Sequence, residues 1–190
     1  VDDGLGNYTW AQVRDGAGTA AASLLVSMGI TISTGPNSGN WRALTRGFFL
    51  FNTKYIPLNA VISAATFRFT VSARDSGVPS QSIILVSSSP ASDSFLVASD
   101  HSQVGTTAFS SSVTMASLNI NGSTYNDISL NAAGLAAISR GGITRLAMMV
   151  LSDFNNAEPT WPNPNVAGSI TVRTFEAGGT VRPLLEVTYS

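Results

Sequence analysis

Histidine and cysteine, the residues most often used for nucleophilic and metal chemistry, are almost missing from this chain. His101 is the only histidine and there is no cysteine, so a zinc site of nitrogen and sulfur ligands cannot be assembled. A Ser-His-Asp triad is numerically available, because Asp100 precedes His101 and serines are abundant. However, the sequence contains no Gly-x-Ser-x-Gly elbow, the turn that presents such a serine. We therefore interpret His101 as a loop residue.

Carboxylates are the second candidate for chemistry. A glycosidase needs two of them about 5–9 Å apart, and most of the eleven acidic residues stand alone in turn-like segments, such as Asp15, Asp75 and Asp93. The sequence leaves a pair brought together by folding open. Because no nucleophile–base pair has a recognisable spacing, we predict that the chain is not an enzyme.

A structural calcium ion is the one candidate cofactor. Asp2, Asp3 and Glu176, with Asn7 and Asp153 as further partners, offer the oxygen ligands that calcium prefers. Against this hypothesis, no Asp-x-Asp-x-Asp-Gly loop is present. Acidic residues solvated in turns are the alternative interpretation.

Aromatic residues in loops are the candidates for binding. Trp161 lies in the proline-rich segment Glu158–Asn165, where Asn163 and Asn165 add amide donors and acceptors. An indole ring can stack on a sugar or pack in a protein interface, and a stiff loop loses little order on binding. We predict contact with a glycan or a neighbouring subunit through Trp161, Asn163, Asn165 and Trp41. For Trp41, which flanks a strand, packing in the core is the alternative.

Composition excludes several classes of partner. The net charge is −1, only 11% of residues are charged, and Lys54 is the single lysine, so the chain lacks the basic patch expected for nucleic acid or anionic lipid. No apolar run reaches the roughly 18 residues of a membrane helix, and no membrane insertion is expected. Length suits one domain over residues 1–190, which can bury about 70% of its unfolded surface without a disulfide.

Period-two alternation of apolar and polar residues predicts an all-β, antiparallel sandwich. Two runs, Phe48–Phe51 and Leu146–Leu151, are apolar on both faces and are expected to be central strands. Further strands are predicted over 82–87 and 125–130. The apolar faces of the alternating strands are Leu24, Val26, Met28, Ile30 and Ile32; Val61, Ala65, Phe67, Phe69 and Val71; Ile170 and Val172; and Leu185, Val187 and Tyr189. Residues expected to share one core are Phe49, Phe51, Phe67, Phe69, Val187 and Tyr189.

One short helix is predicted near 132–140. Asn131 is a suitable N-cap, Leu135 and Ile138 are three residues apart, and Gly141 follows as a stop signal. A helical turn near 93–99 is a weaker candidate.

The order of several segments resembles the DNRLRE-type domain and its carbohydrate-binding-module-like jelly-roll relatives. The matching segments are Arg46–Phe51, Ile56–Pro57, Ser63–Phe67, Tyr125–Ala132 and Arg182–Tyr189, with Leu96–Asp100 and Val104–Ala108 similar to phage-borne members. The resemblance extends over residues 8 to 190. It implies a jelly-roll module of secreted, cell-surface or virion-surface proteins, and it supplies no catalytic residue.

Together these observations predict a non-catalytic structural or attachment module of an extracellular or virion-surface assembly. A carbohydrate-binding module of a secreted polysaccharide-active protein is the alternative. The expected partners are glycans or neighbouring subunits, including copies of the chain itself. The absence of an initial methionine at Val1 is typical of a processed protein or a piece of a longer one. Residues 1–8, polar and interrupted by glycine, would make a poor donor strand for a neighbour's sheet.

Overall fold

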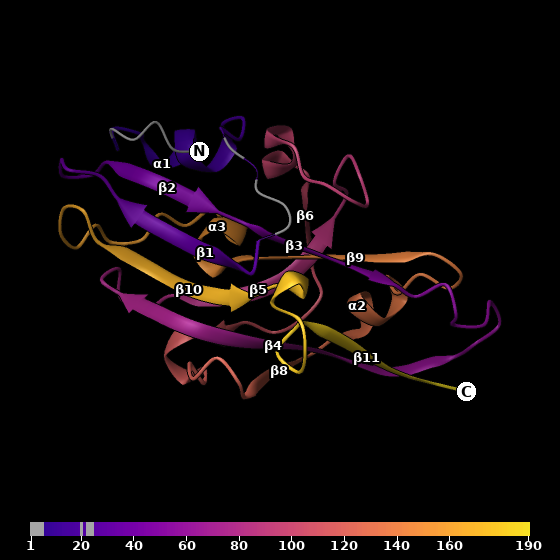
Figure 1. Cartoon of the computed structure of the whole chain (residues 1–190). Helices are drawn as coiled ribbons and strands as arrows, with labels where there is room; N and C mark the ends of the chain where they lie inside the picture. The colour runs from indigo at the N-terminus through magenta and orange to yellow at the C-terminus, as the bar shows by residue number, and fades with distance from the viewer. Residues whose placement is uncertain (1–5, 20, 22–24) are drawn as a thin grey trace.

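The structure, a computed structural model, describes residues 6–19, 21 and 25–190. Within them, antiparallel strands form a six-stranded and a five-stranded sheet (Figure 1). The six-stranded sheet consists of β1 (Ser27–Thr34), β2 (Trp41–Thr45), β4 (Ile62–Ser76), β8 (Tyr125–Ser129), β10 (Ala167–Arg173) and β11 (Leu184–Tyr189). The five-stranded sheet consists of β3 (Gly47–Asn52), β5 (Ser82–Ser88), β6 (Val104–Ala108), β7 (Val113–Thr114) and β9 (Ile143–Val150).

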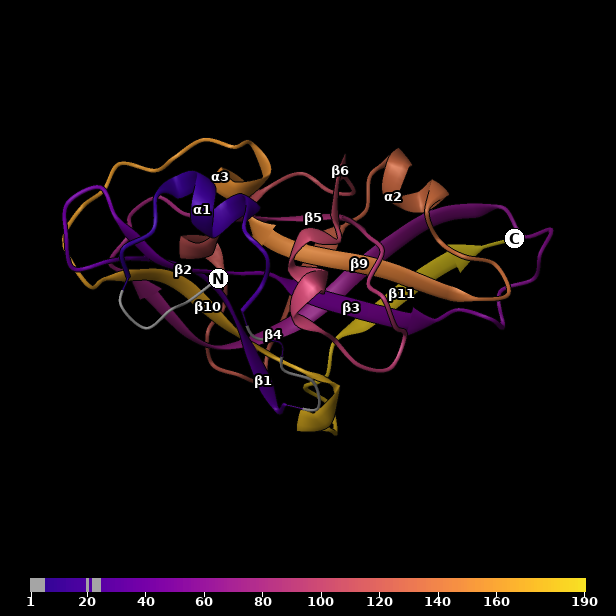
Figure 2. The ribbon, with the colours of Figure 1, turned by 90° about the horizontal axis from the view of Figure 1, so that it is seen from above.

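The long strand β4 organises the larger sheet. Its first half pairs with β11 and its second half with β10, while β8 pairs across the middle. Beyond β10 follow β1 and β2, and the smaller sheet runs in the order β3-β9-β5-β6 with β7 beside β5. In Figure 2 the strands β9 and β3 cross over β4 and β11, so the two sheets form two layers.

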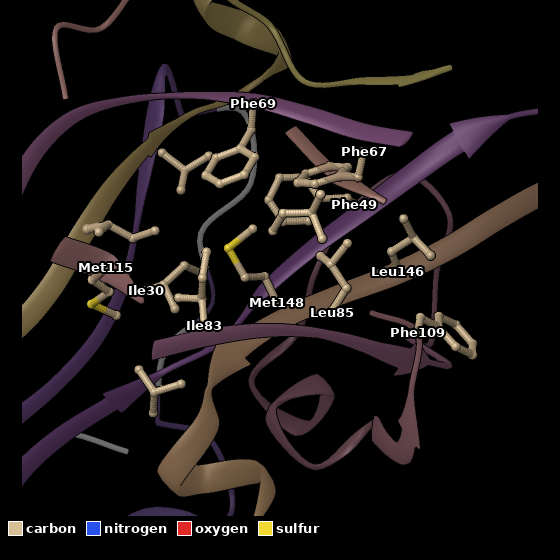
Figure 3. Packing of buried hydrophobic residues seen from close by; sticks show 14 of the residues in the cluster. Ile30, Phe49, Phe67, Phe69, Ile83, Leu85, Phe109, Met115, Leu146 and Met148 are labelled. Carbon is tan, nitrogen blue, oxygen red and sulfur yellow. The ribbon is translucent and has the colours of Figure 1, made fainter. Parts of the chain in front are cut away.

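The main core lies between the layers (Figure 3). Phe67 is completely buried, and its ring centroid lies 4.7 Å from that of Phe49 and 5.4 Å from that of Phe69. Phe51 and Val187 are partly buried against the same cluster. The predicted aromatic core is therefore confirmed for these five residues.

The core prediction is wrong for Tyr189, since 45% of its surface is exposed. The pairing of β11 with β4 shifts register between Thr188 and Tyr189, and a bulge changes the face to which the following side chain points. Val61 and Val26, at 65% and 57% exposed, also lie outside the core, because both precede their strands. Leu24 lies outside the described residues.

The second sheet is covered on both faces. In β9, Leu146 and Met148 enter the main core, whereas Ala147 and Met149 belong to a second, smaller cluster on the outer face. This explains the unbroken apolar run, and the prediction that this strand is central is confirmed. The run Phe48–Phe51 was expected to be central too, but β3 is an edge strand. Phe48 is apolar because it packs on the second cluster.

The helices are short. α2 (Ala132–Ala136) begins at the predicted cap, where the side-chain oxygen of Asn131 accepts from the Gly134 amide, but it ends four residues before the predicted end. The expectation of one helix is wrong, because α1 (Trp10–Asp15) and α3 (Leu151–Phe154) also form. The described part of the chain also contains the 3-10 turns η1 (Ala98–Ser102), η2 (Met115–Ser117) and η3 (Phe175–Ala177). Among the described residues no helix has the length and apolar character needed to cross a membrane.

Phe67→Ala should lower the free energy of unfolding by about 3–5 kcal/mol, because it removes a ring that contacts three other phenylalanines. Tyr189→Ala is the matched control, since its ring is half exposed and a surface change rarely exceeds about 0.5 kcal/mol. Urea unfolding of both variants measures the difference. Equal losses would show that the assignment of faces is wrong.

Candidate functional site

The proline-rich loop around Trp161 packs against the turn between β1 and β2. The Thr34 hydroxyl is buried and donates to the carbonyl of Asn163 at 2.7 Å. The backbone amide of Asn165 donates to the Gly35 carbonyl at 3.2 Å, and the Arg42 guanidinium donates to the Asn165 side chain at 2.7 Å. The two loops therefore form one surface at the end of the two layers, on the left in Figures 1 and 2.

Three tryptophans hold this loop and the segment that leads into it. The indole N–H of Trp10 donates to the Asn156 side chain at 3.2 Å, and that of Trp41 donates to the Glu158 carboxylate at 2.7 Å. Trp161 donates to the Asn40 carbonyl at 2.9 Å. The rings of Trp10 and Trp41 also pack edge to face, with centroids 5.5 Å apart. The loop is thus held at several points and is pre-organised.

The predicted contact residues differ in exposure. Asn163 and Asn165 are exposed, as the prediction requires. Trp161 is only partly exposed and packs against the main core, so it presents less of its ring than the sequence suggests. Trp41 is completely buried, and its prediction as a surface contact is wrong. Trp41 instead anchors the start of the loop, because its indole N–H donates to the Glu158 carboxylate.

More amides lie on the same surface than sequence reasoning found. The side-chain oxygen of Asn7 accepts from the side-chain amides of Asn37 at 2.9 Å and Asn40 at 3.4 Å. We call the five residues Asn7, Asn37, Asn40, Asn163 and Asn165 the amide tip. Sequence proximity gave no signal for this grouping, because Asn7 reaches the tip only through the pairing of Tyr8 with Trp41.

The predicted calcium ligands are not brought together in the described residues. Asp2 and Asp3 lie outside them, and Glu176 is exposed in η3. Asp153 is completely buried beneath two arginines and Asn7 belongs to the amide tip. No cluster of three or more histidine or acidic side chains occurs within the ranges described above. Calcium binding at the first residues stays a prediction.

A cluster of charged groups surrounds Asp153. The Arg46 guanidinium, with its side chain 6% exposed, donates to both carboxylate oxygens at 2.7 Å. It also donates to the backbone carbonyls of Arg14 and His101, and Arg14 donates to the Asp153 carbonyl at 3.0 Å. The charges of Arg46 and Asp153 are thereby paired with each other, and the remaining guanidinium donors have backbone acceptors. The cluster joins α1, η1 and α3 to the corner between β2 and β3, and we interpret it as structural.

His101 lies beside this cluster and is neutral near pH 7. Burial, together with the nearby Arg46 guanidinium, lowers the pKa of His101 to about 4. Arg46 approaches the ring Nδ1 at 3.3 Å, and because a guanidinium can only donate, Nδ1 accepts. His101 is thus held in the 3-10 turn η1 by packing and by Arg46.

Comparison with known proteins adds no assignment. No protein-family model matches the chain, and no curated protein matches it either.

Asp153→Asn should lower the free energy of unfolding by about 3–5 kcal/mol, since it leaves the buried Arg46 guanidinium without its counter-charge. Asp93→Asn is the control, because its two-point pair with Arg145 is about 40% exposed on both sides and is expected to contribute at most about 1 kcal/mol. Denaturant unfolding at pH 7 compares them. A loss at Asp153 no larger than that at Asp93 contradicts the structural role.

Stability should fall as the pH drops from about 6.5 to about 4, in part through His101. The folded pKa lies below the unfolded value, so the unfolded state binds more protons in this window. The contribution of His101 to stability is fully present above its unfolded pKa and is lost as the pH falls toward its folded pKa. His101→Gln removes this contribution, so its unfolding free energy should vary less with pH than that of the wild type. Parallel curves for the two proteins would show that His101 titrates normally.

Proposed function

We propose that the chain is a non-catalytic attachment module of an extracellular or virion-surface assembly, built as a single jelly-roll-like domain over residues 1–190. The amide tip is the observation on which this proposal rests. Two loops are fixed to each other by backbone and side-chain hydrogen bonds, and tryptophan N–H groups fix their bases. A surface organised before it meets its partner loses little order on binding. This tip is the proposed contact surface.

The chemistry of the tip favours an uncharged partner. Asn163 and Asn37 are exposed and uncharged, and a side-chain amide can donate and accept at the same time. The nearby Arg42 is already engaged with Asn165. We therefore propose contacts made by hydrogen bonds and partly exposed apolar rings, with little electrostatic steering.

Carbohydrate binding is the second candidate, and it is favoured by the position of Trp161 beside the amides. Neighbouring hydroxyls of a sugar offer paired donors and acceptors, and the exposed part of the ring offers an apolar face. The same groups also suit the surface of a neighbouring subunit, including a second copy of this chain. The proposal therefore names one surface with two classes of partner, and the experiment below separates them.

The surroundings of the charged groups support a role without catalysis. Asp153 is enclosed by arginine donors, and Nδ1 of His101 faces the Arg46 guanidinium. Arg68 pairs with Asp127 and Glu186 across three strands on the outer face. Such pairs suit structural roles, because each of these carboxylates is engaged by an arginine.

The double variant Asn163→Ala/Asn37→Ala should weaken binding by about tenfold or more, since each lost hydrogen bond contributes about 0.5–1.5 kcal/mol. Folding should be nearly unchanged, because the Asn163 side chain has no hydrogen bond within the described residues and Asn37 makes one exposed bond. Asn59→Ala is the control, since Asn59 is exposed in the loop between β3 and β4 at the other end of the layers.

A glycan array and sedimentation velocity measure the two classes of partner separately. Loss of array signal assigns the tip to carbohydrate, and loss of self-association assigns it to a subunit contact. If the double variant behaves like Asn59→Ala in both measurements, the tip is not the contact surface.

A further inference from the structure

An apolar groove of about 540 Å³ runs along the edge strand β3. It contacts six consecutive residues, Phe48 to Thr53. Alternate side chains of a strand point to opposite faces, so a groove that reaches every residue in turn must follow the edge of the strand. β3 is the last strand of its sheet. Its free edge is therefore one wall of this groove.

The backbone groups on that edge can be assigned from the pairing with β9. The Thr53 amide donates to the Gly142 carbonyl at 2.9 Å, which makes this a hydrogen-bonded pair. In an antiparallel ladder such pairs alternate, so Phe49 and Phe51 face β9. The N–H and C=O groups of Phe48, Leu50 and Asn52 point into the groove, with no strand partner among the described residues. An edge of this kind is a template for another strand.

The opposite wall is also apolar. It includes Leu25, Phe175 and Leu184, and 45% of Leu25 and 66% of Phe175 are exposed. Seen from above, the start of β1 and the yellow turn between β10 and β11 reach out further than β3 (Figure 2). The edge of β3 is thus set back behind these two segments. They would hinder the approach of a second folded sheet more than that of a single extended strand.

Charge specifies the kind of strand that fits. No residue from Gly47 to Thr53 is charged, and the opposite wall carries one acid, Glu176, and one base, Arg182. The Arg182 guanidinium lies over the Phe175 ring, 5.4 Å from its centroid. A charged strand would lose hydration against the apolar walls without gaining an opposite net charge. An uncharged strand avoids the cost of desolvating a charge.

We propose that the edge of β3 receives an extended, uncharged strand with apolar alternate residues, supplied by a different protein. The added strand hydrogen-bonds to Phe48, Leu50 and Asn52 and lays one row of side chains on Leu25, Phe175 and Leu184. It extends the five-stranded sheet by one strand. This surface is separate from the amide tip, so either proposal can fail without the other.

Hydrogen exchange followed by NMR tests the proposal with the peptide acetyl-Thr-Val-Thr-Val-Thr-Val-Thr-amide. The peptide should slow the exchange of the Phe48, Leu50 and Asn52 amides, which face the groove. The Phe49 and Phe51 amides, which already pair with β9, should change little. A peptide with proline at the central position should have no effect. No slowing up to the solubility limit of the peptide overturns the proposal.

Leu50→Pro and Leu50→Val separate backbone pairing from apolar contact. Proline removes an N–H that points into the groove and takes no hydrogen bond from the pairing with β9. Peptide binding should weaken by at least about tenfold in Leu50→Pro and change little in Leu50→Val, while thermal unfolding shows that both fold. Equal binding by both variants overturns strand addition and indicates an apolar ligand that ignores the backbone. Slowed edge amides that depend on protein concentration without peptide would instead identify a second copy as the occupant, which contradicts the proposed partner.

Discussion

One buried guanidinium holds the corner between β2 and β3, where the chain first passes from the larger sheet to the smaller. Arg46 lies between β2, at the edge of the larger sheet, and β3, at the edge of the smaller one. A charge at this depth requires a counter-charge and hydrogen-bond partners on every donor. Asp153 supplies the first, and the carbonyls of Arg14 and His101 supply others. Four segments far apart in the sequence must therefore meet at this point.

The same requirement explains how the amide tip is built. Buried indole N–H groups need acceptors, and those of Trp10 and Trp41 find them in Asn156 and Glu158. These acceptors follow directly after α3, which Asp153 ties to Arg46. The loop at the tip therefore begins from a position that the buried ion pair fixes. Core packing, the corner and the amide tip depend on one another through a few polar contacts.

The edge strands of the two sheets differ in charge. On β8 and β11, Asp127 and Glu186 both pair with Arg68 of β4, and exposed charges near an edge discourage pairing with other chains. β3 carries no charge. Its apolar run predicts a central strand, because both faces of a central strand are covered. In fact Phe49 faces the core, Phe48 packs on the second cluster, and the edge is open.

The sequence by itself determined the β class, most strand positions, the N-cap at Asn131 and the aromatic core around Phe67, because alternation and capping are local patterns. It also identified the loop of Asn163 and Asn165 as polar and stiff. Only the tertiary structure decided that Trp41 is buried, that Asn7 joins the tip, and that Tyr189 turns outward at a bulge. Each of these depends on which distant segment lies alongside, since burial and strand register arise from long-range pairing that no local pattern encodes.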